Sequence, residues 1–404
     1  MQEAGRPAPR SYARPRPPLP PMIYLDHAAT TPLDARVLAA MLPWLEGGYG
    51  NASSVHRAGR EARGAVETAR ARVARHLGAE PAEIVFTSGG TEADNLALRG
   101  AVPRGRALVT SAAEHEAVLS TAHALESDGR HVVRLAPGPR GAVTASAVAD
   151  ALDATPGVAL VSLMHVNNET GAVTDLAAVA RECRARGVLL HTDAVQSAGL
   201  LPLDAHALGV DFLALSAHKF NGPKGVGALF VRAGAPLDPT VTGGSQERGR
   251  RGGTENVAGI VGLAAALDLA AEDRAARLDR LAALRARLHD RLRAALGERF
   301  VTVTPPGENA PHVLNVAFPP GPHGPVDGEM LILGLDLEGV CASSGSACTS
   351  GALSPSHVLL SMGLERATAA AAVRFSLGRT TTEADVDHGA DALARVARRM
   401  GLVG

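Results

Sequence analysis

The chain has 404 residues, of which 46% are hydrophobic but only 3% aromatic, so its core is expected to consist mainly of Ala, Val and Leu. Its 40 Lys and Arg residues balance 41 Asp and Glu residues, which leaves no net field to attract nucleic acid or an anionic membrane. Three cysteines make neither a disulfide framework nor a zinc spacing, and no segment is apolar enough to span a bilayer. We therefore expect a cytoplasmic globular protein with no direct nucleic-acid or membrane partner and no metal site.

The N-terminal third opens with a segment rich in Pro and Arg, residues 1–21, which lacks the apolar run of a signal peptide and is predicted to be a disordered leader. Residues 58–77 then carry apolar side chains at helical spacing. A short strand at 83–87 leads through a glycine turn into another helical pattern, which begins at Gly90 and Thr91. Such a turn offers free backbone N–H groups to a phosphate, although it could equally do no more than cap the helix.

Strand and helix patterns alternate along the middle of the chain. The predicted strands cover residues 107–110, 131–135, 158–166, 188–192 and 211–215. This alternation predicts a mostly parallel sheet with helices on both faces. His115 lies at a corner between a strand and a helix, and Asn168 lies in a polar loop that follows an apolar strand. Loops at strand ends are where catalytic groups concentrate, so both residues are candidates.

Polar side chains follow the last two of these strands, namely Asp193, Gln196, Ser216, His218 and Lys219. The carboxyl ends of parallel strands converge on one crevice, so these side chains are expected to meet. A lysine at a buried strand end has a lowered pKa, as a Schiff-base lysine requires. A lysine that holds an aldehyde and an acid that protonates a ring nitrogen suit pyridoxal phosphate. A lysine that snorkels to solvent, or a structural salt bridge, is the alternative interpretation.

The rest of the chain predicts a second, smaller α+β domain. A Gly-rich basic segment, 242–256, contains Thr254 and is interpreted either as a mobile loop or as an anion-binding loop at a subunit boundary. Helical periodicity follows over 257–296, and strands are expected near residue 301 and at 312–318 and 372–377. We divide the chain into a leader, 1–21, a large domain, 22–260, whose first residues could pack on the small domain, and a small domain, 261–404.

The small domain contains a run of small residues around Cys348. Gly and Ser on both sides of this cysteine cannot pack a core, so the run is predicted to be an exposed loop. A free thiol in such a loop is a chemical liability unless the protein uses it. Cys183 and Cys341, by contrast, accompany apolar patterns and are predicted to be structural.

Five motifs together resemble the cysteine desulfurases of the NifS/IscS type, which belong to the class V aminotransferase family. The motifs are His165-Val-Asn-Asn-Glu169, His191-Thr-Asp-Ala-Val-Gln196, Ser216-Ala-His-Lys219, Arg251-Gly-Gly-Thr254 and Ser343-Ser-Gly-Ser-Ala-Cys348. The resemblance runs from about Met22 to the C-terminus. It implies the α/β architecture of fold type I pyridoxal-phosphate transferases, in which a large domain carries the cofactor and a smaller α+β domain carries the cysteine loop. It also implies a homodimer.

The resemblance assigns a role to each candidate residue. Lys219 would carry the cofactor and shuttle protons, Cys348 would accept the sulfur, and His115 would stack on the ring and assist proton transfer. The residues implied for cofactor binding are Gly90, Thr91, Asn168, Asp193, Gln196, Ser216, His218 and Lys219, together with Thr254 from the other subunit. Asn168 and Arg374 would bind the substrate carboxylate, because an arginine fork matches a carboxylate with two parallel bonds.

The implied reaction converts L-cysteine to L-alanine and leaves a persulfide on Cys348. The sulfur acceptor is expected to be an iron–sulfur scaffold protein or a tRNA thiolation enzyme. Two other functions remain open at this point. A selenocysteine lyase would use the same site, and a persulfide carrier without catalytic activity would keep the fold but would have no need for Lys219 and Asp193.

Overall fold

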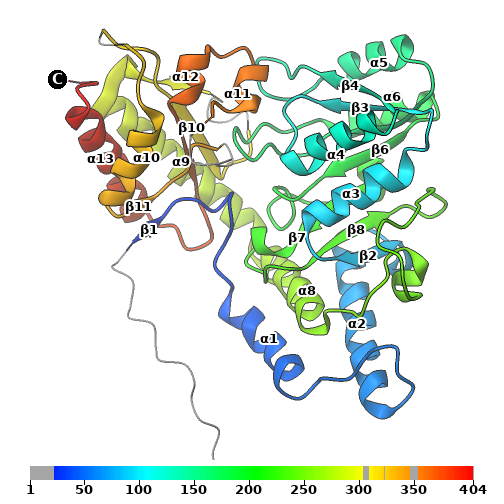
Figure 1. Ribbon diagram of the computed structural model, residues 1–404. Coiled ribbons are helices and arrows are strands. Elements are labelled where there is room, and N and C mark those ends of the chain that lie inside the picture. Colours follow the sequence, from blue (N-terminus) through cyan, green and yellow to red (C-terminus); the bar gives the residue numbers. More distant parts are fainter. Residues whose placement is uncertain (1–21, 304–308, 323, 346–353, 404) are drawn as a thin grey trace, which may run out of the picture.

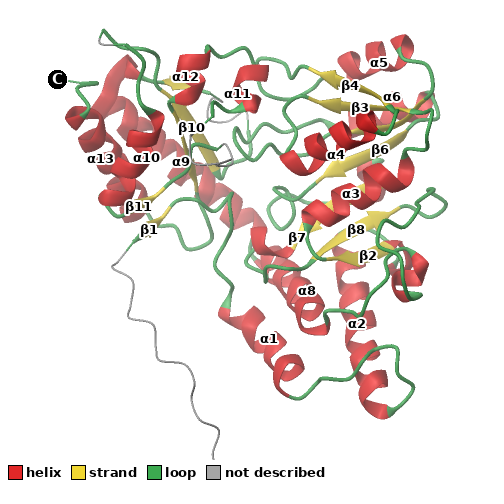
Figure 2. Cartoon of the chain, in the orientation of Figure 1, coloured by secondary structure: helices red, strands yellow, loops and turns green. Residues whose placement is uncertain are grey.

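The computed structural model describes residues 22–303, 309–322, 324–345 and 354–403 (Figure 1). A large sheet with helices on both faces stands beside a smaller unit that contains both antiparallel and parallel strand pairs (Figure 2). The predicted leader, 1–21, and the predicted sulfur acceptor, Cys348, lie outside the described residues.

The large sheet has seven strands and is mostly parallel, as predicted. In spatial order they are β2 (Ile84–Thr87), β8 (Gly227–Val231), β7 (Phe212–Ser216), β6 (Leu189–Asp193), β5 (Val158–Ser162), β3 (Ala107–Ser111) and β4 (His131–Leu135). Only β8 runs antiparallel to both of its neighbours, β2 and β7. The carboxyl ends of β6 and β7 therefore lie side by side, with Asp193 paired in register with Ala214.

Helices cover both faces of this sheet because its strands are apolar on both sides. One face is covered by α3 (Gly90–Ala101) and α4 (Glu116–Ser127), and the other by α2 (Arg57–His76), α5 (Ala145–Ala154), α6 (Leu176–Ala185) and α8 (Val257–Glu272). Cys183 is 1% exposed and belongs to the core beneath α6, as its helical spacing predicts. The helix α1 (Ala35–Glu46) packs on α8, and the single-turn helix α7 (Ala205–Leu208) leads into β7.

The smaller unit contains a three-stranded antiparallel sheet in the order β12 (Ala372–Ser376), β10 (Val313–Ala317), β9 (Val301–Thr302). Its helices are α9 (Arg274–Leu296), α10 (Gly328–Leu337), α11 (His357–Ser361), α12 (Arg366–Ala370) and α13 (Glu383–Arg399). The N-terminal strand β1 (Ile23–Tyr24) pairs in parallel with β11 (Val340–Cys341), and Leu25 lies in the core of this unit. The described chain thus begins in the smaller unit and then crosses to the larger one.

The structure corrects two of the predicted elements. The helical periodicity over 257–296 comes from two helices, α8 and α9, which meet at Asp273, where φ is −122° and ψ is 20°. The apolar run 158–166 is a regular strand only as far as Ser162, although Leu163 and His165 still donate backbone hydrogen bonds to β6 and its end. Apolar periodicity carried no sign of either break, because apolar side chains continue at a similar spacing beyond each break.

The packing of α8 indicates where the chain passes from the large unit to the smaller unit. Residues of α8 as far as Leu267 belong to the core of the large sheet, whereas α9 contributes to the core of the smaller unit. We propose that the boundary lies at Asp273 rather than at the predicted residue 260. In the described part of the chain, the helices are all too short or too polar to cross a bilayer.

The 242–256 segment is held to the large domain by a buried ion pair. The Arg70 guanidinium donates to both carboxylate oxygens of Glu247, at 2.7 and 2.8 Å, and these side chains are only 4% and 3% exposed. One Glu247 oxygen also accepts a hydrogen bond from the backbone of Phe86 at 2.9 Å. Glu247 has a φ of 48°, which a non-glycine residue adopts only where its surroundings fix it.

We predict that Arg70→Met lowers the free energy of unfolding by about 3 kcal/mol or more, because it leaves a buried carboxylate without its cation. Chemical denaturation followed by circular dichroism measures the change. The matched control is Arg57→Met, which removes an exposed pair with Glu61 whose side chains are 85% and 56% exposed. That control should leave stability nearly unchanged, because exposed ion pairs contribute little. Equal losses in the two variants would show that the Arg70 pair does not anchor the segment.

Candidate active site

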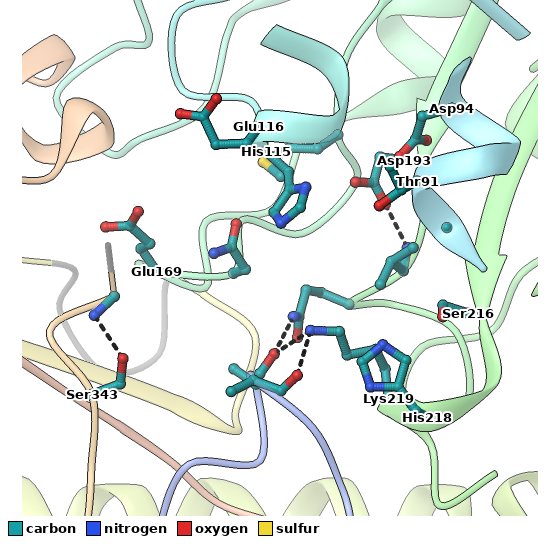
Figure 3. A pocket seen from close by; sticks show the side chains of 18 of the residues that line it. Thr91, Asp94, His115, Glu116, Glu169, Asp193, Ser216, His218, Lys219 and Ser343 are labelled. Atoms are coloured by element: carbon teal, nitrogen blue, oxygen red, sulfur yellow. Dashed lines mark hydrogen bonds between the residues drawn. The ribbon is translucent and has the colours of Figure 1, made fainter. Parts of the chain in front are cut away.

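A cavity of about 360 Å³ opens at the carboxyl ends of β6 and β7, between the large sheet and the smaller unit. Ten of the predicted site residues line it, namely Gly90, Thr91, His115, Asn168, Asp193, Gln196, Ser216, His218, Lys219 and Arg374. Figure 3 shows Thr91, Asp94 and Asp193 on one side of this cavity, Glu169 and Ser343 on the other, and His115 and Lys219 between them. The convergence expected from strand order is therefore present.

Lys219 ends a 3-10 turn, Ala217–Lys219, that directly follows β7. Its ammonium group donates to the backbone oxygens of Ala28 and Ala29, at 2.7 and 2.9 Å. Burial and the charge of Arg374 together lower the pKa of this amine from 10.5 to about 8, while Asp193 and Asp26 oppose the shift. An amine with this pKa is partly deprotonated at neutral pH, and the free amine is the form that attacks an aldehyde.

Asp193 is the last residue of β6 and is 5% exposed. Its Oδ1 accepts a hydrogen bond from the backbone of Val195 at 2.8 Å. The pKa of this carboxyl is raised to about 6, mainly because the group is buried; a charge on Asp94 would act in the same direction, and His115 opposes the shift. A carboxyl in this setting gains most from a cation placed in the cavity beside it, and a protonated pyridine nitrogen is such a group.

His115 is the N-cap residue of α4, and its Nδ1 accepts a hydrogen bond from the backbone of Ala117 at 3.1 Å. This contact fixes Nδ1 as the acceptor nitrogen. Burial lowers the pKa of the imidazole, with Lys219 adding to the shift and Asp193 opposing it. A neutral imidazole that lines the cavity can take up a proton there.

The N-terminus of α3 forms one end of the cavity. The helix begins at Gly90, where an added Cβ would lie 2.6 Å from Cγ2 of Val195, so a larger residue would fill the turn. The first N–H groups of a helix bind phosphate, and Thr91 adds a hydroxyl. His218, from the turn after β7, lies in the same wall with Ser216, and its Nδ1 contacts Oγ1 of Thr30 at 3.0 Å.

Arg374 reaches the cavity from β12 and is 3% exposed. Its Nη2 donates to Oδ1 of Asp26 at 2.8 Å, and its Nη1 donates to the backbone oxygen of Asn168 at 2.9 Å. Within the described part of the chain, its Nε has no hydrogen-bond partner. The guanidinium is thus held in place by both units, and its buried Nε is a donor without a partner among the described residues.

Gln196 links the site to the smaller unit from the other side. Its Nε2 donates to the backbone oxygen of Ala28 at 2.8 Å, and its Oε1 lies 3.4 Å from Nε2 of His312. Ala28 therefore accepts from both Gln196 and Lys219, so one short N-terminal segment positions both side chains.

Among the predicted site residues in the described part of the chain, Thr254 is the one that does not line this cavity. Thr254 lies in a separate hollow of about 110 Å³, beside Ser88 and Gly225. Because Thr254 was expected to act on a second subunit, its role stays a prediction. Cys348 lies outside the described residues, and its role also stays a prediction.

The cavity contains functional groups that the sequence did not single out, namely Asp94, Glu116, Met164, Glu169, Ser343 and His357, and Asp26 lies just behind Arg374. A signal existed for Asp94, which follows Thr91 by three residues and so lies on the same side of α3. Asp26 and His357 come from loops or units remote in sequence, so no local pattern connects them to the site.

Comparison with known proteins identifies the family. The class V aminotransferase model matches residues 23–388, so the chain belongs to that family. Within it, the chain is similar to the cysteine desulfurase IscS of Dictyoglomus turgidum, at 41% identity over 94% of this chain and 96% of the relative. A solved NifS-like protein is 36% identical, has a TM-score of 0.85, and is matched over 94% of this chain and 100% of its own.

A second solved structure, described as SspA in complex with cysteine, is 34% identical with a TM-score of 0.75, and the match covers 88% of this chain and 98% of that one. The chain is thus a pyridoxal-phosphate-dependent enzyme of the NifS/IscS-like, cysteine desulfurase group. The residues of the cavity fit this cofactor. The raised pKa of Asp193 favours a cation beside it, the lowered pKa of Lys219 favours a free amine, and the start of α3 suits a phosphate.

We predict that reduction of the pyridoxal-phosphate-loaded protein with borohydride labels the peptide that contains Lys219. Labelling of that peptide by free cofactor should rise through about pH 8, because the amine becomes nucleophilic as pH passes its lowered pKa. Peptide mass mapping measures the site. Exposed Lys224, five residues away, is the internal control and should stay unlabelled at substoichiometric cofactor. A label on Lys224, with Lys219 unmodified, would refute the assignment.

Proposed function

We propose that this enzyme converts L-cysteine to L-alanine and leaves the sulfur as a persulfide on Cys348. The observation that carries the proposal is the composition of the cavity wall. Lys219 and Asp193 come from the large sheet, whereas Ser343 and Gly345, which lead toward Cys348, come from the smaller unit. A single cavity thus contains the groups for amino-acid chemistry and borders the segment that carries a thiol.

Chain connectivity places a limit on the distance to Cys348. Gly345 lines the cavity and precedes Cys348 by three residues, which span at most about 11 Å when fully extended. The approach to Gly345 is fixed, because the backbones of Ser343 and Arg374 exchange two hydrogen bonds. The chain that leads toward Cys348 is therefore hydrogen-bonded, at Ser343, to Arg374, the residue proposed to bind the substrate.

Each side chain has a proposed task. The cofactor supplies an aldehyde for the substrate amine and a ring that takes up electrons. Arg374, positioned by Asp26, binds the substrate carboxylate, and Asn168 lies beside it in the cavity wall. Lys219 would hold the cofactor and would take the proton from the α-carbon of the substrate, while His115 would offer a second, neutral proton acceptor.

The sulfur step balances without an external oxidant. The thiolate of Cys348 attacks the sulfur of the substrate, a new S–S bond forms, and the bond between that sulfur and the β-carbon breaks. The electron pair of the broken bond remains with the carbon, which gains a proton and becomes the methyl group of alanine. L-Cysteine and a protein thiol thus give L-alanine and a protein persulfide.

The later fate of the sulfur and the assembly of the protein are also proposals. Cytoplasmic iron–sulfur cluster assembly is the proposed destination, with a scaffold protein or a tRNA thiolation enzyme as the acceptor. The similarity to IscS supports this destination. We propose a homodimer, in which Thr254 of one chain would meet the phosphate end of the other cavity. The separate hollow around Thr254 in the single chain accords with this arrangement.

We predict that Cys348→Ser stays folded and binds pyridoxal phosphate but releases alanine at least about 100-fold more slowly, because a hydroxyl is a poor nucleophile toward sulfur at neutral pH. Alanine and sulfide assays measure the change. Cys341→Ser is the matched control and should keep turnover. Full alanine release from Cys348→Ser would overturn the proposal. A strong preference for L-selenocysteine in parallel assays would instead favour a selenocysteine lyase.

A further inference from the structure

The cofactor site has a buried polar layer behind Asp193. His191 and Asp193 lie two residues apart on β6, so both side chains point to the same face of the sheet. That face is covered by α3, which brings Asp94 against them. The carboxyl Oδ1 of Asp94 lies 3.4 Å from Nε2 of His191, and these side chains are 1% and 0% exposed. Figure 3 shows Asp94 beside Asp193 at the cavity wall.

This layer continues away from the cavity. The other ring nitrogen of His191, Nδ1, lies 2.8 Å from the hydroxyl of Ser162 on β5, and the hydroxyl of Thr110 donates to the backbone oxygen of Ser162 at 2.9 Å. Nε2 of His191 and Oδ1 of Asp94 are both buried and have no assigned hydrogen-bond partner in the described part of the chain. The contact between these two atoms is therefore the one in which a proton can serve both groups.

Several negatively charged carboxylates cannot be buried together in this polar layer at a low free-energy cost. The titratable groups that interact with Asp94 are Asp193 and His191 from β6 and Glu114 from the loop after β3. His115, at the start of α4, and Lys219 interact in turn with Asp193. Both imidazoles have pKa values lowered by burial, so neither supplies a cation. Three ionised carboxylates in this dry layer would repel one another, with only the amine of Lys219, which interacts with Asp193, to compensate. Of the three carboxyls, Asp193 is the one best stabilised in its ionised form, because a backbone N–H donates to it and it faces the proposed cofactor nitrogen.

We propose that Asp94 is a positioning residue that retains a proton and directs it to His191, so that Asp193 is the one of these two aspartates that is ionised. The proposal rests on the role proposed above for Asp193. A neutral Asp94 spares Asp193 a like charge, and its hydrogen bond fixes the tautomer of His191, with Nδ1–H directed at Ser162. These contacts hold β6, the strand that carries Asp193, without placing a second negative charge beside that residue.

The proton on Asp94 links stability to pH with a definite sign. Burial raises the pKa of Asp94 from 3.8 to about 8. Its contribution to folding is therefore fully present below the unfolded value of 3.8 and is lost progressively as pH rises to about 8. An asparagine at this position has nearly the same shape and does not titrate. The difference in stability between Asp94→Asn and the wild type should thus move in favour of the variant as pH rises.

The test compares unfolding midpoints of full-length, cofactor-loaded wild type and Asp94→Asn between pH 6 and pH 9. We expect the unfolding midpoint of the variant minus that of the wild type to increase as pH rises toward about 8. Asp128→Asn is the matched control, because Asp128 is bound to Arg104 and Arg130 and has a lowered pKa, so its difference from wild type should stay flat in this range. A flat or opposite trend for Asp94→Asn would mean that Asp94 is an ionised partner of His191, and would overturn the proposal.

A second measurement needs no variant. In wild-type holoenzyme whose aspartates carry a ¹³C carboxyl label, infrared spectra at pH 7 should contain the C=O band of a protonated aspartic acid, and this band should fade as pH passes about 8. Absence of the band at pH 7 would refute the proposal even if Asp94→Asn fails to fold. Both readouts are independent of turnover, so loss of sulfur transfer in other variants would leave the result for Asp94 unchanged.

Discussion

The active site depends on the burial of two groups of opposite charge, Asp193 and Lys219, at the ends of neighbouring strands. Burial raises the pKa of Asp193 to about 6 and lowers that of Lys219 to about 8, so each group is brought toward neutrality. The parallel pairing of β6 with β7 places both at one edge of the sheet. A cofactor that offers a cationic ring nitrogen and an aldehyde satisfies both groups at once, which is why this family chemistry suits this fold.

The N-terminal segment joins the two units around this pair. Its first strand, β1, belongs to the smaller unit, and Leu25 is fully buried in that core. Directly afterwards, Asp26 holds Arg374, and the backbone oxygen of Ala28 accepts from Lys219 and Gln196. The arginine proposed to bind substrate and the lysine proposed to bind cofactor are thus positioned by residues only two apart in the chain. A shift of this segment would disturb both.

The sequence was sufficient to predict site residues that directly follow a buried strand in the chain. Lys219, Asp193 and the turn at Gly90 follow buried strands, and the structure brings these residues to one cavity. It was insufficient where a function depends on contacts between distant segments. Asp26 is recognised only once β12 delivers Arg374 to it, and Asp94 only once α3 lies on β6. The break at Asp273 was missed because both flanking helices carry apolar residues at helical spacing and neither a glycine nor a proline marks it.

The charge of Asp193 is the central claim, and Asp193→Asn tests it directly. An amide keeps the shape of the side chain and can still lie beside the ring, so the variant should bind pyridoxal phosphate. It cannot balance a cationic ring nitrogen, so we expect alanine formation to fall by about 100-fold or more. Cofactor absorbance measured together with steady-state alanine release separates binding from turnover. Cofactor binding with activity within a few-fold of wild type would contradict the account and would make Asp193 a purely structural residue.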